Sequence, residues 1–275
     1  MRDRTKSVLP RSLLRCLAVF VAGLAGPAHT PAGAGAAIPA LDHIVVVVME
    51  NHSFSQVIGN PEAPFINQLA RGGALFTQSL AVAHPSEPNY LALFSGSTQG
   101  VADNGSHSFK APTLAGQLRA AGKRFTGYAE TGSPRRHAPW KSFEESHDVE
   151  RPFSEFPSDF TKLPAVSFVV PNLAHDMHDG SVEQGDGWLR RHLAPYAEWC
   201  ASHDSLLVIT FDEGGSGLPN HIPTVFVGRS VQPGRYSDTI DHYTVLRTIE
   251  AIEGLPPLGE SARKAPISTV WRRGA

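Results

Sequence analysis

Short runs of β-branched and aromatic residues, separated by helix-type segments, constrain the fold of this chain most. Continuous apolar runs at 43–49, 165–170 and 205–211 have the length and composition of strands buried on both faces, and 222–227 is a fourth such run. A shorter strand is predicted at 124–129.

Segments with apolar residues at helical spacing lie between these strands. They predict helices at 64–73, 113–122, 188–200 and 241–254, the third interrupted or kinked by Pro195. Residues 131–164 are expected to form an irregular excursion. The alternation predicts an α/β fold with a mainly parallel central sheet flanked by helices on both faces.

The first 36 residues differ in composition from the rest of the chain. Basic residues at positions 2, 4, 6, 11 and 15 precede an apolar run at 16–25 and then small residues. This order is typical of a secretory signal peptide, and the apolar run is short for a membrane span. We expect residues 1–36 to be a signal peptide, with an uncleaved anchor as the alternative. Residues 37–275 would then form a secreted or extracytoplasmic domain without a stable membrane span.

Charge and cysteine content limit the partners and the means of stabilisation. The formal net charge is −2, so nothing in the overall charge favours nucleic acid as a partner. Without residues 1–36 only Cys200 remains, and a single cysteine cannot form an internal disulfide. Its apolar surroundings predict a buried structural thiol.

Acidic and amide side chains follow two of the predicted strands. Glu50 and Asn51 come directly after the strand at 43–49, and Asp212 and Glu213 come directly after the strand at 205–211. If these strands are neighbours, four oxygen-bearing side chains converge, at a high cost unless a divalent cation lies between them. Oxygen ligands suit Ca²⁺, Mg²⁺, Mn²⁺ or Zn²⁺. The alternative is that each pair is a helix cap or a pair of surface acids.

Ser86 precedes a helix-type stretch, with Pro88 suited to its first turn. A helix N-terminus favours an anion such as phosphate, and a metal ion nearby would lower the pKa of the hydroxyl and make it a nucleophile. The alternative role for Ser86 is that of an ordinary N-cap.

Thirteen histidines are present, and three stand in polar clusters: His137, His178 (followed by Asp179) and His242. Each could hold phosphate oxygens or protonate a leaving group. A structural role is the alternative for each.

Several motifs together extend the pattern from about residue 41 to 255. They are Glu50-Asn51-His52-Ser53-Phe54, His84-Pro85-Ser86-Glu87-Pro88-Asn89-Tyr90, Tyr128-Ala129-Glu130, Arg136-His137-Ala138-Pro139, 170–180, Gly185-Asp186-Gly187-Trp188-Leu189, Thr210-Phe211-Asp212-Glu213 and 242–250. In content and order they resemble the phosphoesterase family of bacterial acid phosphatases and phospholipases C, within the alkaline phosphatase superfamily.

The resemblance implies an alkaline-phosphatase-like core, and a phosphoesterase catalytic domain at 37–275 with a small phosphorylated substrate. It implies that one divalent metal ion is bound by Glu50, Asn51, Asp212 and Glu213, and that Ser86 forms a phosphoserine intermediate. His137, His178 and Asp179 fall in motifs on the phosphate side. His175, where the family often has asparagine, and Glu87, an acid beside the serine, depart from the family pattern and put the substrate in doubt.

Other functions remain open at this point. A phospholipase C or another phosphodiesterase would use the same residues as a monoesterase. A metal-independent serine carboxylesterase would use Ser86 without Glu50 or Asn51. A non-catalytic secreted binding protein is the third alternative, and nothing in the sequence sets the oligomeric state.

Overall fold

Strands and helices alternate along the chain in a computed structural model that describes residues 37–215 and 219–272. The predicted signal peptide at 1–36 lies outside the described residues. The strands and α-helices, in chain order, are β1 (His43–Met49), α1 (Phe54–Val57), α2 (Pro64–Gly72), β2 (Ala74–Leu80), α3 (Ser86–Ser95), α4 (Leu114–Ala120), β3 (Phe125–Ala129), β4 (Glu150–Pro152), β5 (Val166–Val170), α5 (Val182–Cys200), β6 (Ser205–Phe211), β7 (Thr224–Val227), β8 (Gly234–Asp241) and α6 (His242–Glu253).

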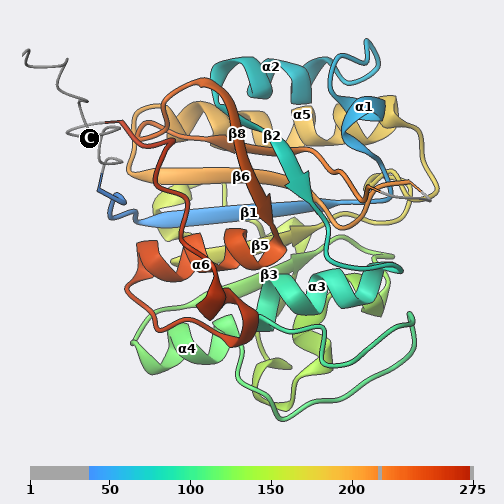
Figure 1. The fold of residues 1–275 in the computed structure, drawn as a ribbon, viewed down its shortest axis with the longest axis vertical. Helices are drawn as coiled ribbons and strands as arrows, with labels where there is room; N and C mark the ends of the chain where they lie inside the picture. The colour runs from blue at the N-terminus through green and yellow to red at the C-terminus, as the bar shows by residue number, and fades with distance from the viewer. Residues whose placement is uncertain (1–36, 216–218, 273–275) are drawn as a thin grey trace, which may run out of the picture. The chain divides into compact units, whose positions relative to one another are not determined.

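The strands form one eight-stranded sheet in the order β4-β3-β5-β1-β6-β7-β2-β8. Strand β7 pairs antiparallel with β6 and with β2, and the other neighbouring pairs are parallel. The prediction of an α/β fold with a mainly parallel sheet is therefore confirmed. Strand β1 lies between β5 and β6, near the middle of the sheet (Figure 1).

The side chains of β1 show why its sequence is continuously apolar. Ile44, Val46 and Val48 pack into one hydrophobic cluster, while Val45 and Val47 pack into a second. Successive side chains of a strand point to opposite faces, so a strand with helices on both sides needs apolar residues at every position. Helices α3, α4 and α6 cover the first face, and α2 and α5 cover the second (Figure 1).

Helix α2 depends on a side chain from α5 for its N-terminal cap. Its own N-cap residue, Ala63, has no side-chain acceptor. The buried Asp186 carboxylate accepts hydrogen bonds from the backbone N–H groups of Phe65 (3.0 Å) and Ile66 (2.8 Å) instead. These are donors that a helix start leaves without an intrahelical partner, so Asp186 joins α2 to α5.

Helix α5 differs from its prediction. It begins at Val182, six residues before the predicted start, and runs through Pro195 without interruption. Ser181 and Gln184 form a capping box, in which the Ser181 hydroxyl accepts from the Gln184 N–H at 3.2 Å. Pro195 is exposed, so water can reach the backbone carbonyl that the missing N–H leaves unbonded.

Strands β2, β4 and β8 were not predicted from the sequence. Strand β8 is an edge strand whose side chains are mostly polar and partly exposed, so it has no hydrophobic signature. The excursion at 131–164 is confirmed as a series of single 3₁₀ turns with the three-residue strand β4.

Cys200 is buried, as predicted. In the described part of the chain, no helix combines the length and apolar character needed to cross a membrane.

Candidate active site

The two acidic pairs lie at adjacent strand ends. Strands β1 and β6 are parallel neighbours with Met49 opposite Phe211, so the residues that follow them meet at one edge. The Asp212 N–H donates to the Met49 carbonyl at 2.9 Å, and the Asn51 N–H donates to Asp212 Oδ1 at 3.1 Å. Asn51 has φ of +52°, a left-handed conformation that asparagine tolerates better than most residues. The two strands are neighbours, so the condition for convergence of these side chains is met.

Ser86 is the first residue of α3 and is 2% exposed. Its hydroxyl oxygen lies 3.3 Å from Glu50 Oε2 and 3.2 Å from Glu213 Oε1, and it donates toward these carboxylates. The N-cap of α3 is Pro85, which makes no side-chain cap, and the Glu87 N–H of the first turn donates to Asn104 Oδ1 at 3.0 Å. The Ser86 hydroxyl is therefore directed at the carboxylates of Glu50, Asp212 and Glu213, the acidic cluster, and does not cap its own helix.

The acidic cluster carries more negative charge than its protein partners neutralise. Burial, followed by the nearby carboxyls of Asp212 and Asp176, raises the pKa of Glu50 well above its usual value. Burial, followed by Glu213, raises the pKa of Asp212 to about 7. Asp212 Oδ2 is buried and has no hydrogen-bond partner among the described residues. A buried, unpartnered carboxylate oxygen among other acids fits a bound divalent cation.

His137 lies in a second part of the same cluster, between two carboxyls. Its Nε2 is 3.2 Å from Glu50 Oε1 and its Nδ1 is 3.2 Å from Asp176 Oδ2. Burial, followed by the charge of Arg136, lowers the pKa of His137 to about 2, so the ring is neutral. Burial also raises the pKa of Asp176 to about 7. Ligand atoms of Glu50, His137 and Asp176 lie within 4.8 Å of one another, so these three could also hold a metal ion.

His178 and Asp179 lie beside His137, where the motif resemblance had grouped them. The rings of His137 and His178 have centroids 6.0 Å apart. His178 Nδ1 lies 2.6 Å from Asp179 Oδ1, and Arg136 Nη2 lies 3.2 Å from His178 Nε2. Because arginine can only donate, His178 Nε2 accepts and its Nδ1–H donates to Asp179, which defines a neutral tautomer.

His242 is buried, as His137 is. It begins α6, and its Nε2 lies 2.6 Å from the backbone carbonyl of Asp212. Burial lowers its pKa, which favours the neutral ring. Its contact is with the backbone of the acidic cluster, so the structural alternative describes His242 better.

Sequence reasoning missed three polar side chains of the site. The Tyr90 hydroxyl donates to Glu50 Oε1, and the Tyr90 ring stacks on His137 with centroids 5.1 Å apart. Asp176 contacts His137, and His84 Nδ1 contacts Glu213 Oε2. Tyr90 could have been found from its spacing, because it follows Ser86 by four residues and so shares its face of the helix.

Comparison with known proteins identifies relatives of this chain. Residues 60–256 match the phosphoesterase family. The chain is 47% identical over 255 residues to the phosphatidylinositol-3-phosphatase of Mycobacterium tuberculosis, and the match covers 86% of this chain and 85% of that protein. It is 28% identical over 258 residues to the phosphate-repressible acid phosphatase of Penicillium chrysogenum, covering 80% of this chain and 61% of the fungal protein.

The fold has structural counterparts as well. A protein in the alkaline phosphatase superfamily from Vibrio parahaemolyticus superposes with a TM-score of 0.62 at 15% identity, covering 85% of this chain and 72% of that one. The expected alkaline-phosphatase-like core is therefore confirmed. The chain belongs to the phosphoesterase family, and it is a hydrolase of phosphoric ester bonds.

Proposed function

We propose that this protein hydrolyses phosphate monoesters through a phosphoserine formed on Ser86, and that it depends on one divalent metal ion. The observation that carries the proposal is the buried Ser86 hydroxyl, held 3.2–3.3 Å from carboxylates that follow two neighbouring strands. The names of the two curated relatives, a phosphatidylinositol-3-phosphatase and an acid phosphatase, support a monoester substrate.

The metal ion would be held at the strand ends by Glu50, Asn51, Asp212 and Glu213. The unpartnered Asp212 Oδ2 and the raised pKa values of Glu50 and Asp212 support this assignment. When bound, such an ion neutralises negative charge and lowers the pKa of a nearby hydroxyl. The ion could be Ca²⁺, Mg²⁺, Mn²⁺ or Zn²⁺, since the donors are carboxylate and amide oxygens. The cluster of Glu50, His137 and Asp176 is a second way to hold it.

The reaction would proceed in two displacements at phosphorus. In the first, Ser86 Oγ forms a bond to phosphorus as the bond to the ester oxygen breaks; the serine proton passes toward the adjacent carboxylates, and the departing oxygen takes up a proton from water to leave as the alcohol. In the second, a water oxygen bonds to phosphorus, the bond to Ser86 Oγ breaks, Ser86 regains a proton and inorganic phosphate is released. At the start of α3 the Glu87 N–H donates to Asn104 Oδ1 at 3.0 Å and Pro88 has no N–H, so the positive end of the helix dipole would favour the negative charge that develops on the phosphoryl oxygens.

His178 and Arg136 are placed to bind the phosphoryl group. Arg136 Nη2 donates a hydrogen bond to His178 Nε2 at 3.2 Å. Arg136 Nε is buried and has no hydrogen-bond partner among the described residues. That unsatisfied donor is available to a phosphate oxygen, which would form a charge-assisted hydrogen bond. Asp179 orients His178, and the neutral His137 separates Glu50 from Asp176.

Export is the remaining part of the proposal. The basic, apolar and small-residue segments at 1–36 support a cleaved signal peptide and a secreted or extracytoplasmic location. N-terminal sequencing of the protein recovered outside the cytoplasm should find a start near Ala37. If that protein is recovered with Met1 still attached, residues 1–36 act as an uncleaved anchor and not as a cleaved signal peptide.

The function is tested by assaying protein stripped of metal and re-supplied with individual divalent ions. We expect hydrolysis of a chromogenic phosphate monoester and of a phosphoinositide monophosphate to disappear on stripping and to return with one ion. Hydrolysis of a phosphocholine diester should stay far slower. A preference for the diester would favour a phospholipase C, and chelator-insensitive cleavage of a carboxylic ester would favour a serine esterase.

A further inference from the structure

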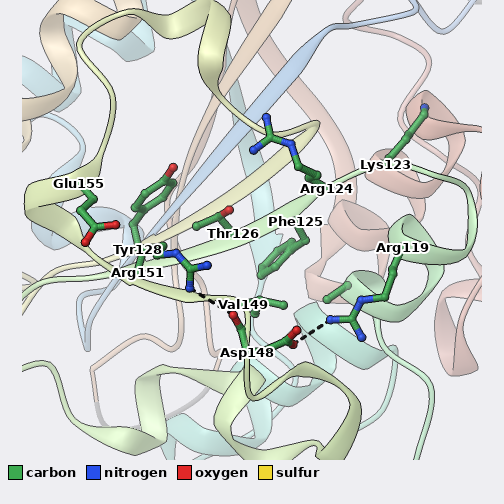
Figure 2. A pocket seen from close by; sticks show the side chains of 11 residues that line it. Arg119, Lys123, Arg124, Phe125, Thr126, Tyr128, Asp148, Val149, Arg151 and Glu155 are labelled. Carbon is green, nitrogen blue, oxygen red and sulfur yellow. Dashed lines mark hydrogen bonds and ion pairs between the residues drawn. The ribbon is translucent and has the colours of Figure 1, made fainter.

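A basic cavity of about 370 Å³ lies at the β4 edge of the sheet, lined by α4, β3 and the turn that enters β4 (Figure 2). Within the described parts of the chain, its lining shares no residue with the active site. Its chemistry therefore needs a separate explanation.

The charged groups of this cavity are not balanced. Four cationic side chains line it against the two acids Asp148 and Glu155. Two of the cations are engaged: Arg119 Nη2 pairs with Asp148 Oδ1 at 2.8 Å, and Lys123 Nζ, which points away from the cavity in Figure 2, pairs with Glu253 Oε2 at 2.7 Å. The other two, Arg124 and Arg151, face the single remaining acid Glu155, and neither forms an ion pair with it, so the lining keeps a net positive charge.

Arg124 and Arg151 make hydrogen bonds to backbone carbonyls. Arg124 Nη2 donates to the Lys162 carbonyl at 3.2 Å, and Arg151 Nη1 donates to the Glu150 carbonyl at 2.6 Å. Among the residues that the structure describes, neither arginine has a carboxylate partner, and a carbonyl orients a guanidinium without neutralising it. Each guanidinium has five N–H donors, so both keep donors for an anion.

Two hydroxyl groups lie near these arginines. In Figure 2 the side chain of Thr126 lies between Arg124 and Arg151, and the ring of Tyr128 lies beside Arg151, its partner across β3 and β4. Burial raises the pKa of Tyr128, so its hydroxyl keeps its proton and can donate. Planar guanidinium groups combined with neutral hydroxyl donors match the oxygens of a phosphate group better than they match a cation or an apolar ligand.

We propose that this cavity is a second, non-catalytic binding site for a phosphate-bearing anion, held by Arg124 and Arg151 with Thr126 and Tyr128. The phosphate can belong to a free solute or to a lipid headgroup, because both present the same oxygens. A protein that binds phosphate at the β4 edge can be held on a phosphate-bearing surface while its active site stays open. The proposal does not depend on the catalytic role of Ser86.

The test is isothermal titration of the full folded protein with inorganic phosphate, which cannot be turned over. The unmodified protein should bind at two sites, one of them catalytic. The double variant Arg124→Ala/Arg151→Ala should lose one site, with an affinity loss of about tenfold or more, because charge-assisted hydrogen bonds are lost. The matched control Arg71→Ala removes an exposed cation from α2 and should keep both sites.

Two further measurements distinguish the outcomes. Hydrolysis of a small chromogenic monoester and the melting temperature should be unchanged in the double variant. Arg151→Gln alone, whose carbonyl contacts are with its own neighbouring segment, provides a variant whose folding is not at issue. Phosphate binding that is the same in the double variant, in Arg71→Ala and in the unmodified protein would overturn the proposal.

Sedimentation with phosphatidylcholine vesicles, with and without phosphatidylglycerol, identifies the source of the phosphate. Loss of vesicle binding in the double variant assigns the site to a lipid headgroup. Phosphate binding that depends on Arg124 and Arg151, without any binding to vesicles, assigns it to a soluble anion. Both results support the anion site. In either case the binding should weaken as the salt concentration rises.

Discussion

Tyr90 and His137 stack on each other, with ring centroids 5.1 Å apart and planes inclined by 11°. Both also contact the same carboxylate oxygen, Oε1 of Glu50. The stacked pair therefore fixes the position of the Glu50 carboxylate, whose other oxygen faces Ser86.

Replacing Tyr90 with phenylalanine tests the contribution of the hydroxyl separately from that of the ring. Tyr90→Phe keeps the stack on His137 but removes the hydrogen bond to Glu50, so kcat should fall about tenfold or more while the melting temperature changes little. Tyr90→Ala should lose activity and stability together, because it also empties a buried ring site. Steady-state kinetics and thermal melts check both. Full activity in Tyr90→Phe would show that the hydroxyl does not position Glu50.

Removing a carboxylate of the strand ends should remove metal and activity together. Glu50→Gln or Asp212→Asn should lose most activity and most bound metal, because each loses a negative charge where a cation is proposed. Elemental analysis of the purified variants beside their kinetics is the measurement. Glu183→Gln, an exposed acid of α5, is the matched control and should keep both properties. Unchanged metal content and rate in either strand-end variant would remove that residue from the site.

The buried Asp186 should contribute to stability apart from catalysis. Asp186→Asn can accept only one of the two N–H donors from Phe65 and Ile66, so the free energy of unfolding should fall by about 1–3 kcal/mol. Urea denaturation measures this, with the exposed Asp42→Asn as a control that should differ little from the unmodified protein. Equal stability of the two variants would contradict the cap that Asp186 gives to α2.

The thiol of Cys200 should be inert in the folded protein. Burial raises its pKa to about 12, so almost no thiolate forms near neutral pH. A thiol with a raised pKa in the folded state contributes to the free energy of unfolding. This contribution is complete below the pKa that the thiol has in the unfolded chain, and it is lost as pH rises toward 12. A thiol reagent at pH 8 should label Cys200 in urea and leave it unlabelled without urea. Rapid labelling of the native protein would contradict the burial.

The sequence predicted the central sheet and one half of the site for a common physical reason. A strand covered by helices on both faces must be apolar throughout, so β1 and β6 stand out, and their carboxyl ends locate Glu50 and Asp212. Strand β8 could not be found in this way, because it is an edge strand with mostly polar side chains. Its place follows from pairing with β2.

The other half of the site depends on packing between distant segments. Asp176 and His137 are on separate irregular segments, and their contact follows from how those segments fold over the sheet ends. Tyr90 contacts Glu50 because α3 is buried against the sheet along its length. No local spacing in the sequence predicts these contacts. The motifs therefore identified His137 and His178 as candidate site residues but did not predict which residues each of them contacts.

Rapid acid quenching of a reaction with a phosphate monoester labelled in its phosphoryl group tests the central claim most directly. If Ser86 is the nucleophile, label should be trapped on the peptide that contains Ser86, and Ser86→Ala should trap none and lose several orders of magnitude in rate while still binding inorganic phosphate. Absence of trapped label, together with turnover by Ser86→Ala at the rate of the unmodified enzyme, would contradict the account and assign the attack to water.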